Sequence, residues 1–102
     1  MEPMLQSNVV TSVSFTGRPS SPQAAGTAIT LTASAEGSSN AVYKFWMQKD
    51  GVWTVIRNYS ISNTCTYILI SADSYYFSVY AKDVNSNTDP EAMKGITYTV
   101  SP

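Results

Sequence analysis

Oxygen-bearing side chains occupy every second position along residues 83–89, namely Asp83, Asn85, Asn87 and Asp89. Hard cations such as Ca²⁺ need several oxygen ligands that converge from one tight turn, so this spacing is typical of the start of a calcium loop. The rest of that motif is missing, because Thr88 replaces the sharp-turn glycine and Lys94 replaces the closing glutamate. An EF-hand is therefore excluded. We favour an Asn- and Asp-rich turn between strands, with a weak, open calcium site as the alternative.

Aromatic side chains form a second candidate site. Trp46, Tyr76 and Tyr80, flanked by Lys44 and Lys82, would form an exposed strip if the strands that carry them are neighbours in one sheet. Flat aromatic rings stack on sugars or anchor a protein partner, since they offer a large area with few rotatable bonds. The favoured interpretation is that these residues are cross-strand pairs covered by lysine stems, which stabilise the sheet and bind nothing. Glycan binding is the alternative.

Few groups in the chain are suited to catalysis. There is no histidine, and the single cysteine, Cys65, excludes an intrachain disulfide, a Cys-x-x-Cys metal site and a dithiol redox pair. We expect Cys65 to pack inward as a small hydrophobic residue. The acidic residues are scattered, and only Asp89 and Glu91 lie close in sequence. No paired acid and base can be assigned, so we expect no enzymatic activity and no cofactor.

Composition limits the remaining possibilities. The 102 residues suffice for one domain with one core, and we expect a monomer. Six basic and seven acidic residues give a net charge of −1 without a basic stripe, which argues against nucleic acid as a partner. No apolar run approaches the length that crosses a membrane, and the first residues lack the pattern of a secretory signal. We therefore expect no membrane insertion.

The elements that must position these residues are strands. Period-two alternation or β-rich runs mark seven segments, at residues 9–16, 27–35, 41–48, 52–58, 64–70, 75–82 and 92–100. Asp50-Gly51 predicts a tight hairpin turn, and the Pro- and Gly-containing loop 17–26 is expected to cross between sheets. Seven short strands predict an all-β fold, an antiparallel two-sheet Greek-key sandwich of the immunoglobulin or fibronectin type III sort.

Side-chain alternation predicts which strand faces are buried. Lys44 and Gln48 share a face with Trp46, and burying them unpaired would be costly, so the opposite face should point inward with Tyr43, Phe45 and Met47. Trp46 should then be at least partly exposed. Segment 52–58 is ambiguous, and we favour Trp53 and Val55 inward. The remaining inward sets are Ile29, Leu31 and Ala33; Cys65, Tyr67 and Leu69; Tyr75, Phe77, Val79 and Ala81; and Ile96, Tyr98 and Val100.

The aromatic placement resembles a known family. The stretches that carry the resemblance are Tyr43-Lys-Phe-Trp46, Gly51-Val-Trp53-Thr-Val, Tyr59-Ser, Ser62-Asn-Thr64 and Tyr75 through Ala81-Lys-Asp83. Together they are similar to the triple-tyrosine-motif modules of bacterial extracytoplasmic proteins, over most of residues 29–100. The resemblance implies an Ig-like sandwich without catalysis that serves as a spacer or interaction unit in secreted, surface or sensor proteins.

The resemblance also implies a setting for the chain. We expect residues 1–102 to be one module, ordered over about residues 9–100, from a larger protein that is extracellular, on the cell surface or periplasmic. Its expected partners are neighbouring domains of that protein or another surface protein.

Tyr75 opens its strand shortly after a turn, where many Greek-key sandwiches have a tyrosine whose hydroxyl returns to a nearby backbone group. We expect Tyr75 to form such a corner. The chain departs from the family pattern twice, with Asp73 where Gly is usual in the preceding turn and Leu69 where Pro is frequent. Asp73 needs either positive φ or a different turn, and Leu69 is expected to extend its strand.

Overall fold

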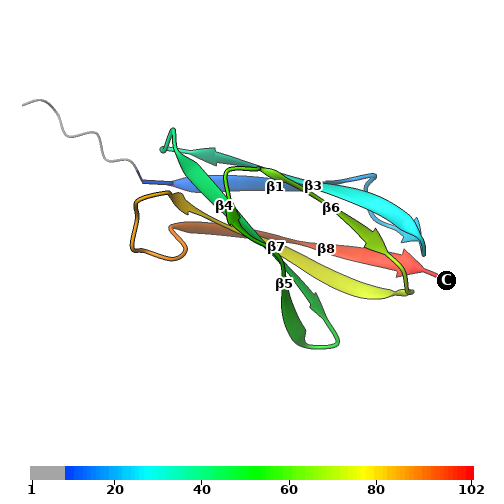
Figure 1. The fold of residues 1–102 in the computed structure, drawn as a ribbon. Helices are drawn as coiled ribbons and strands as arrows, with labels where there is room; N and C mark the ends of the chain where they lie inside the picture. Colours follow the sequence, from blue (N-terminus) through cyan, green and yellow to red (C-terminus); the bar gives the residue numbers. More distant parts are fainter. Residues whose placement is uncertain (1–8) are drawn as a thin grey trace, which may run out of the picture.

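Two β-sheets packed face to face make up the computed structural model, which describes residues 9–102 (Figure 1). One sheet has three strands in the order β1-β3-β6, and the other has five in the order β2-β8-β7-β4-β5. The strand bounds are β1 Ser12–Arg18, β2 Gln23–Ala24, β3 Thr27–Glu36, β4 Ala41–Lys49, β5 Val52–Ser60, β6 Thr64–Leu69, β7 Asp73–Asp83 and β8 Ala92–Ser101. The predicted all-β sandwich is confirmed. No helix that could cross a membrane occurs within residues 9–102.

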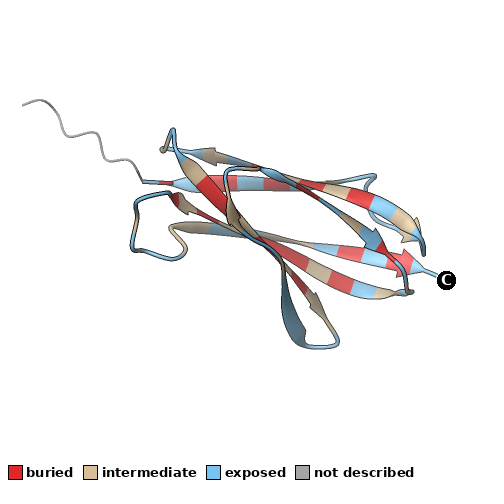
Figure 2. Cartoon of the chain, viewed as in Figure 1, coloured by how far each residue is buried: buried red, intermediate tan, exposed pale blue. Residues whose placement is uncertain are grey.

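The core lies between the sheets and follows the alternation of the sequence. Buried residues alternate with more exposed ones along β1, β3, the end of β8 and, except at Ser78, β7 (Figure 2), because successive side chains of a strand point to opposite faces. Apart from Trp53 and Val55 of β5, the predicted inward sets are confirmed, with Tyr67 and Ile96 only partly buried against the core. The large side chains with almost no exposure are Ile29, Leu31, Phe45, Leu69, Phe77, Val79 and Tyr98.

The loop at residues 17–26 contains an eighth, two-residue strand. Gln23 and Ala24 form β2, which pairs in parallel with Val100 and Ser101 of β8 in the five-stranded sheet. The chain therefore crosses from the sheet of β1 to the opposite sheet, as predicted. It then returns to the first sheet, since β3 pairs antiparallel with β1.

The β4–β5 hairpin has the predicted tight turn. Asp50 and Gly51 have φ values of 53° and 77°, and they alone separate β4 from β5. Positive φ at both central residues is the geometry of a type I′ turn, which matches the twist of the flanking strands. The turn sets the register, so that Lys49 pairs with Val52 and Gln48 with Trp53.

The predicted orientation of β5 was wrong. Trp53 and Val55 are 44% and 41% exposed, and only Ile56 packs partly against the core. The opposing sheet has only three strands, and the β4–β5 turn lies outside the outline of the two packed sheets (Figure 1). Most of β5 is accordingly exposed, and its remaining residues, Ile56, Tyr59 and Ser60, are half-buried (Figure 2). A register shift between Phe45↔Arg57 and Trp46↔Val55 makes Ile56 the extra residue of a bulge.

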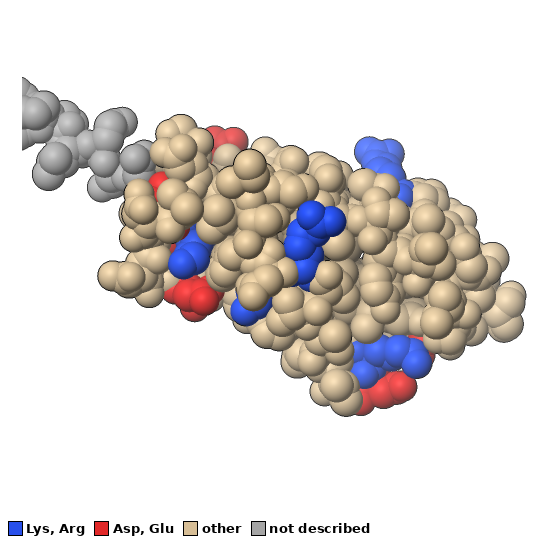
Figure 3. Space-filling model, viewed as in Figure 1, with Lys and Arg blue, Asp and Glu red and all other residues tan. Residues whose placement is uncertain are grey.

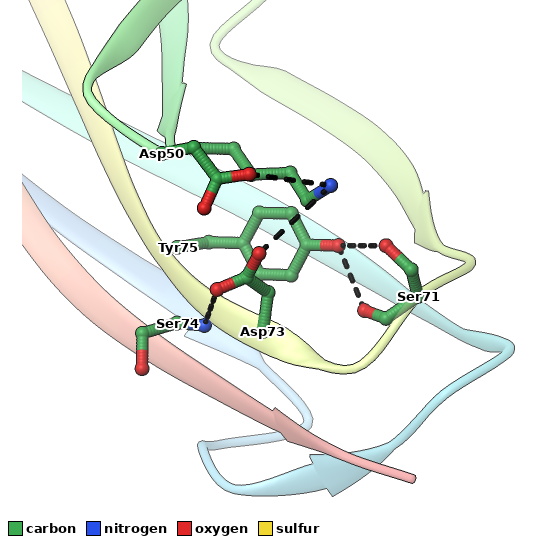
Figure 4. A network of polar contacts seen from close by, with 6 residues as sticks. Asp50, Ser71, Asp73, Ser74 and Tyr75 are labelled. Atoms are coloured by element: carbon green, nitrogen blue, oxygen red, sulfur yellow. Dashed lines mark hydrogen bonds and ion pairs between the residues drawn. The ribbon is translucent and has the colours of Figure 1, made fainter.

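Tyr75 makes the hydrogen bond that the sequence suggested. Its hydroxyl donates to the Ser71 carbonyl at 2.8 Å and lies 3.0 Å from the Ser71 hydroxyl (Figure 4). Asp73 does not adopt positive φ, since Asp50 is the only non-glycine residue between 9 and 102 that does. Instead Asp73 begins β7 in an extended conformation, and its carboxylate accepts the Ser74 amide at 2.7 Å. Leu69 is the last residue of β6 and is fully buried.

Candidate binding face on the five-stranded sheet

The predicted aromatic strip required β4 and β7 to be neighbours, and they are. The two strands pair antiparallel, with Lys44 opposite Tyr80, Trp46 opposite Ser78 and Gln48 opposite Tyr76. Directly opposed side chains lie on the same face of a sheet. The outer face of the five-stranded sheet therefore brings together the predicted strip of Trp46, Tyr76 and Tyr80.

Trp53 joins this strip from β5. Its ring centroid lies 6.2 Å from that of Trp46 and 5.8 Å from that of Tyr76, both in near-perpendicular arrangements. Trp46 and Tyr80 are 5.4 Å apart with their planes at 53°. Such tilted and edge-to-face pairs are the favoured geometries of aromatic rings. The four rings therefore form one continuous cluster.

The position of Trp53 could have been predicted from the turn. A two-residue loop at Asp50-Gly51 pairs Gln48 with Trp53, and Gln48 already had to face outward. Alternation alone left segment 52–58 ambiguous, and the register across the hairpin resolves the ambiguity in favour of an outward Trp53. Turn geometry was therefore the missed signal.

A groove opens among these rings. It has a volume of about 290 Å³, and we call it the aromatic groove; its lining residues are Trp46, Trp53, Tyr76, Ser78, Tyr80 and Met93. Gly95 of β8 makes room for one wall, because a Cβ atom there would lie only 2.0 Å from the Tyr76 hydroxyl oxygen. The Tyr76 side chain thus lies across the bare backbone of β8.

Two polar atoms at the groove have no partner. Trp46 Nε1 and Ser78 Oγ are shielded from solvent and form no hydrogen bond with any residue between 9 and 102. Ser78 is only 2% exposed although it belongs to the outer face. Buried polar groups in native proteins are nearly always paired, so two orphans at one site require an explanation.

Lysines cover the neighbouring part of the face. Lys44 Nζ lies 4.7 Å from the Trp46 ring centroid and 5.7 Å from that of Tyr59, while Lys82 Nζ lies 5.0 Å from Tyr59. Lys44 therefore flanks the strip as predicted, whereas Lys82 is held over Tyr59 and the Ser86 carbonyl. Elsewhere on the side seen in Figure 3, charged side chains are scattered rather than gathered.

The oxygen atoms of residues 83–89 do not converge on one point. Asp83 is buried, and its carboxylate accepts hydrogen bonds from the Ser38 hydroxyl at 2.7 Å and the Asn85 amide at 2.9 Å. Asp89 instead accepts the Tyr59 hydroxyl. Among residues 9–102 no three acidic or cysteine side chains gather as a metal site would require. The carboxylates of Asp83 and Asp89 thus hold separate parts of the loop.

The Glu91 carboxylate and the Tyr59 hydroxyl join this loop to the sheet. The Glu91 carboxylate accepts the backbone amides of Val10 at 2.8 Å and Asp83 at 2.9 Å. A hydrogen bond with the Ser86 side chain first, and then these two amide bonds, lower the pKa of Glu91. Burial first, and then the hydrogen bond to Asp89, raise the pKa of Tyr59. The sequence had indicated Tyr59 only as part of the family resemblance and Glu91 only as a neighbour of Asp89.

Cys65 lies on the inward face of β6 and is buried, as expected. It packs in the same core as Leu31, its cross-strand partner on β3. Its position in the core is that of a small hydrophobic residue.

Fold and site together define an Ig-like, two-sheet β-sandwich with an aromatic outer face. The Y_Y_Y domain family matches residues 34–101, which is two thirds of the chain. The chain belongs to this family of non-catalytic modules, and the resemblance to triple-tyrosine-motif domains is confirmed. A search of curated proteins found no match.

Proposed function

We propose that this chain is a spacer and interaction module of a larger bacterial protein that works outside the cytoplasm. Its family membership supports a module without catalysis. In this role the sandwich separates neighbouring domains and offers its faces and loops to them or to another surface protein.

The path of the chain carries this proposal. The described chain enters at one end of the sandwich, before β1, and β8 ends at the other (Figure 1). Domains joined before β1 and after β8 would therefore be held apart by the length of the strands. The packed core between the sheets resists bending, since close-packed interiors have low compressibility.

Exchange of the module in its intact parent protein tests the spacer role. Replacing residues 9–102 by an unrelated Ig-like sandwich with the same chain path should preserve the activity of the flanking domains. Replacing them by a flexible Gly/Ser linker of equal length should impair it, because such a linker has no fixed span. Full activity with the flexible linker would contradict a spacer role.

The location is tested separately with the intact cell. Protease added to whole cells, or to cells with a permeabilised outer membrane, should remove an epitope tag inserted at Gly51, in the exposed hairpin turn. Protection of the tag until the inner membrane is lysed would place the module in the cytoplasm and contradict the proposal.

A further inference from the structure

We propose that the aromatic groove binds the ring of a neutral pyranose sugar. This inference goes beyond the spacer role, because a domain can separate its neighbours without binding any glycan. It depends on four aromatic walls, two unpaired polar atoms and the charges that surround them.

The walls of the groove suit one face of a sugar ring. The Trp53 ring is nearly perpendicular to the ring of Trp46 and to that of Tyr76. Flat faces therefore border the groove on more than one side. The C–H face of a pyranose is apolar and packs on an aromatic ring, while its hydroxyl groups project from the edge. A volume of about 290 Å³ is at the small end for ligand pockets and suits a single ring more than a bulky chain.

The orphan polar atoms select hydroxyl groups. Trp46 Nε1 only donates a hydrogen bond, whereas the Ser78 hydroxyl both donates and accepts. A sugar hydroxyl can accept from the first and exchange a hydrogen bond with the second. A purely apolar occupant would leave both atoms unpaired, so it would gain less from the site.

Access to either polar atom requires a side chain to move, because Trp46 Nε1 and Ser78 Oγ are both shielded from solvent. Met93 lines the same groove and is 58% exposed, which places a flexible side chain at its rim. Methionine adapts its shape at little cost because its three torsions are unbranched. Rotation of Met93 is the adjustment that admits a hydroxyl group to Ser78.

The charges around the groove disfavour a cation. Rings at right angles can also form a cage for an ammonium group, but the Lys44 ammonium already lies 4.7 Å from the Trp46 ring centroid. Trp46 also offers a donor, which repels a cation, and no carboxylate lines the groove. A neutral, hydroxyl-rich ring is the occupant that satisfies these conditions.

The two tryptophans of the chain provide a direct test. In ¹H–¹⁵N spectra of the labelled protein, each indole gives one Nε1–H signal. Titration with cellohexaose, maltohexaose and mannohexaose at millimolar concentrations should shift both indole signals with at least one of them. The Trp46 signal should move downfield as its N–H gains an acceptor. Tetramethylammonium should shift neither.

Three variants locate the binding. Trp46→Phe keeps an aromatic ring and loses the donor, and Ser78→Ala loses the hydroxyl; each should weaken binding of the responding sugar about fivefold. Thr97→Ala, on an exposed position of β8 outside the groove, should bind like the parent protein. Signals of core residues in the same spectra report whether each variant is folded.

Three outcomes would overturn the proposal. These are the absence of any indole shift with all three sugars, equal affinity of Trp46→Phe and Ser78→Ala with the parent protein, and a response to tetramethylammonium in place of sugar. The last would make the groove a cation cage.

Discussion

Single hydroxyl groups distinguish the inner and outer faces of β7. On the inner face, the Tyr75 hydroxyl has a backbone acceptor in the turn that precedes its own strand. On the outer face, the Ser78 hydroxyl has no partner within residues 9–102. A paired and an unpaired buried hydroxyl make opposite contributions to stability, so their removal should have opposite effects.

Tyr75→Phe should lower the free energy of unfolding by about 1 kcal/mol, because it removes the bond to the Ser71 carbonyl while keeping the ring in the core. Urea denaturation measures the change. Ser71→Ala is the matched comparison and should cost less, since the backbone acceptor remains. An unchanged denaturation midpoint for Tyr75→Phe would contradict the corner role.

Ser78→Ala should raise the free energy of unfolding by about 1 kcal/mol, because an unpaired buried hydroxyl is replaced by a methyl group of similar size. Thermal denaturation by circular dichroism tests this. Ser12→Ala, at an exposed position of β1, should leave the transition unchanged. A destabilised Ser78→Ala variant would show that the hydroxyl is satisfied in the folded protein.

At the scale of elements, the outer face is built by β5, β4, β7 and β8 together. β4 carries Trp46 and β7 carries Tyr76, but the hairpin turn brings Trp53 beside them. β8 has no side chain at Gly95, and the Tyr76 side chain fills the space that a side chain there would take. The groove is thus a property of four adjacent strands.

Gly95→Ala should destabilise the domain by about 1–3 kcal/mol, because the added Cβ lies where the Tyr76 hydroxyl and ring are. Urea denaturation measures this decrease in the free energy of unfolding. In a Tyr76→Ala background the same change should cost much less, since the clash is gone. Equal costs in both backgrounds would show that Tyr76 is not the obstacle.

The Glu91 hydrogen bonds connect the residue before β8 to Val10, which precedes β1, and to Asp83 at the end of β7. The pKa of Glu91 is lower in the folded protein than its usual 4.5. The folded state therefore binds this proton less tightly than the unfolded state. The stabilising contribution is present above pH 4.5 and is lost as the pH falls through the lower, folded pKa.

Glu91→Gln should accordingly flatten the loss of stability on acidification below pH 4.5. Urea denaturation at a series of pH values measures it. Glu36→Gln replaces an exposed carboxylate that does not accept the Val10 or Asp83 amide, and it serves as the comparison. If the free energy of unfolding of Glu91→Gln fell with pH as steeply as that of the parent protein, the acid sensitivity would belong to other groups.

At the scale of the whole molecule, β5 is the long edge strand of the five-stranded sheet, whose other edge is the two-residue strand β2. An open edge is a template for pairing with another chain, and bulges and charged residues are the usual protection. The register shifts between β4 and β5 and the exposed Arg57 provide both. The edge is therefore poorly suited to continuous pairing.

We expect the protein to be a monomer of 11.1 kDa in light scattering coupled to size exclusion. Because the irregular, charged edge of β5 is what protects it, Arg57→Val should raise the tendency of the protein to self-associate as its concentration increases. Arg18→Val, at the end of β1, should have less effect. A parent protein that elutes as a stable dimer would contradict this reading of β5.

The features that were predicted correctly from the sequence depend on short stretches of the chain. The inward set of Tyr43, Phe45 and Met47 follows from alternation beside Lys44, and the hairpin turn follows from the dihedral tolerance of Asp50-Gly51. Family membership rests on the same aromatic pattern.

Tertiary structure decided whether each strand face is covered. Val52 and Thr54 pair with Lys49 and Met47 on the inner face, yet they are exposed because the opposing sheet has three strands and does not extend over β5. The sequence of β5 carries no record of that limit, since burial of its inner face depends on a sheet formed by distant residues. The same dependence explains why the aromatic groove, with its unpaired Ser78 hydroxyl, emerged only from the packed strands.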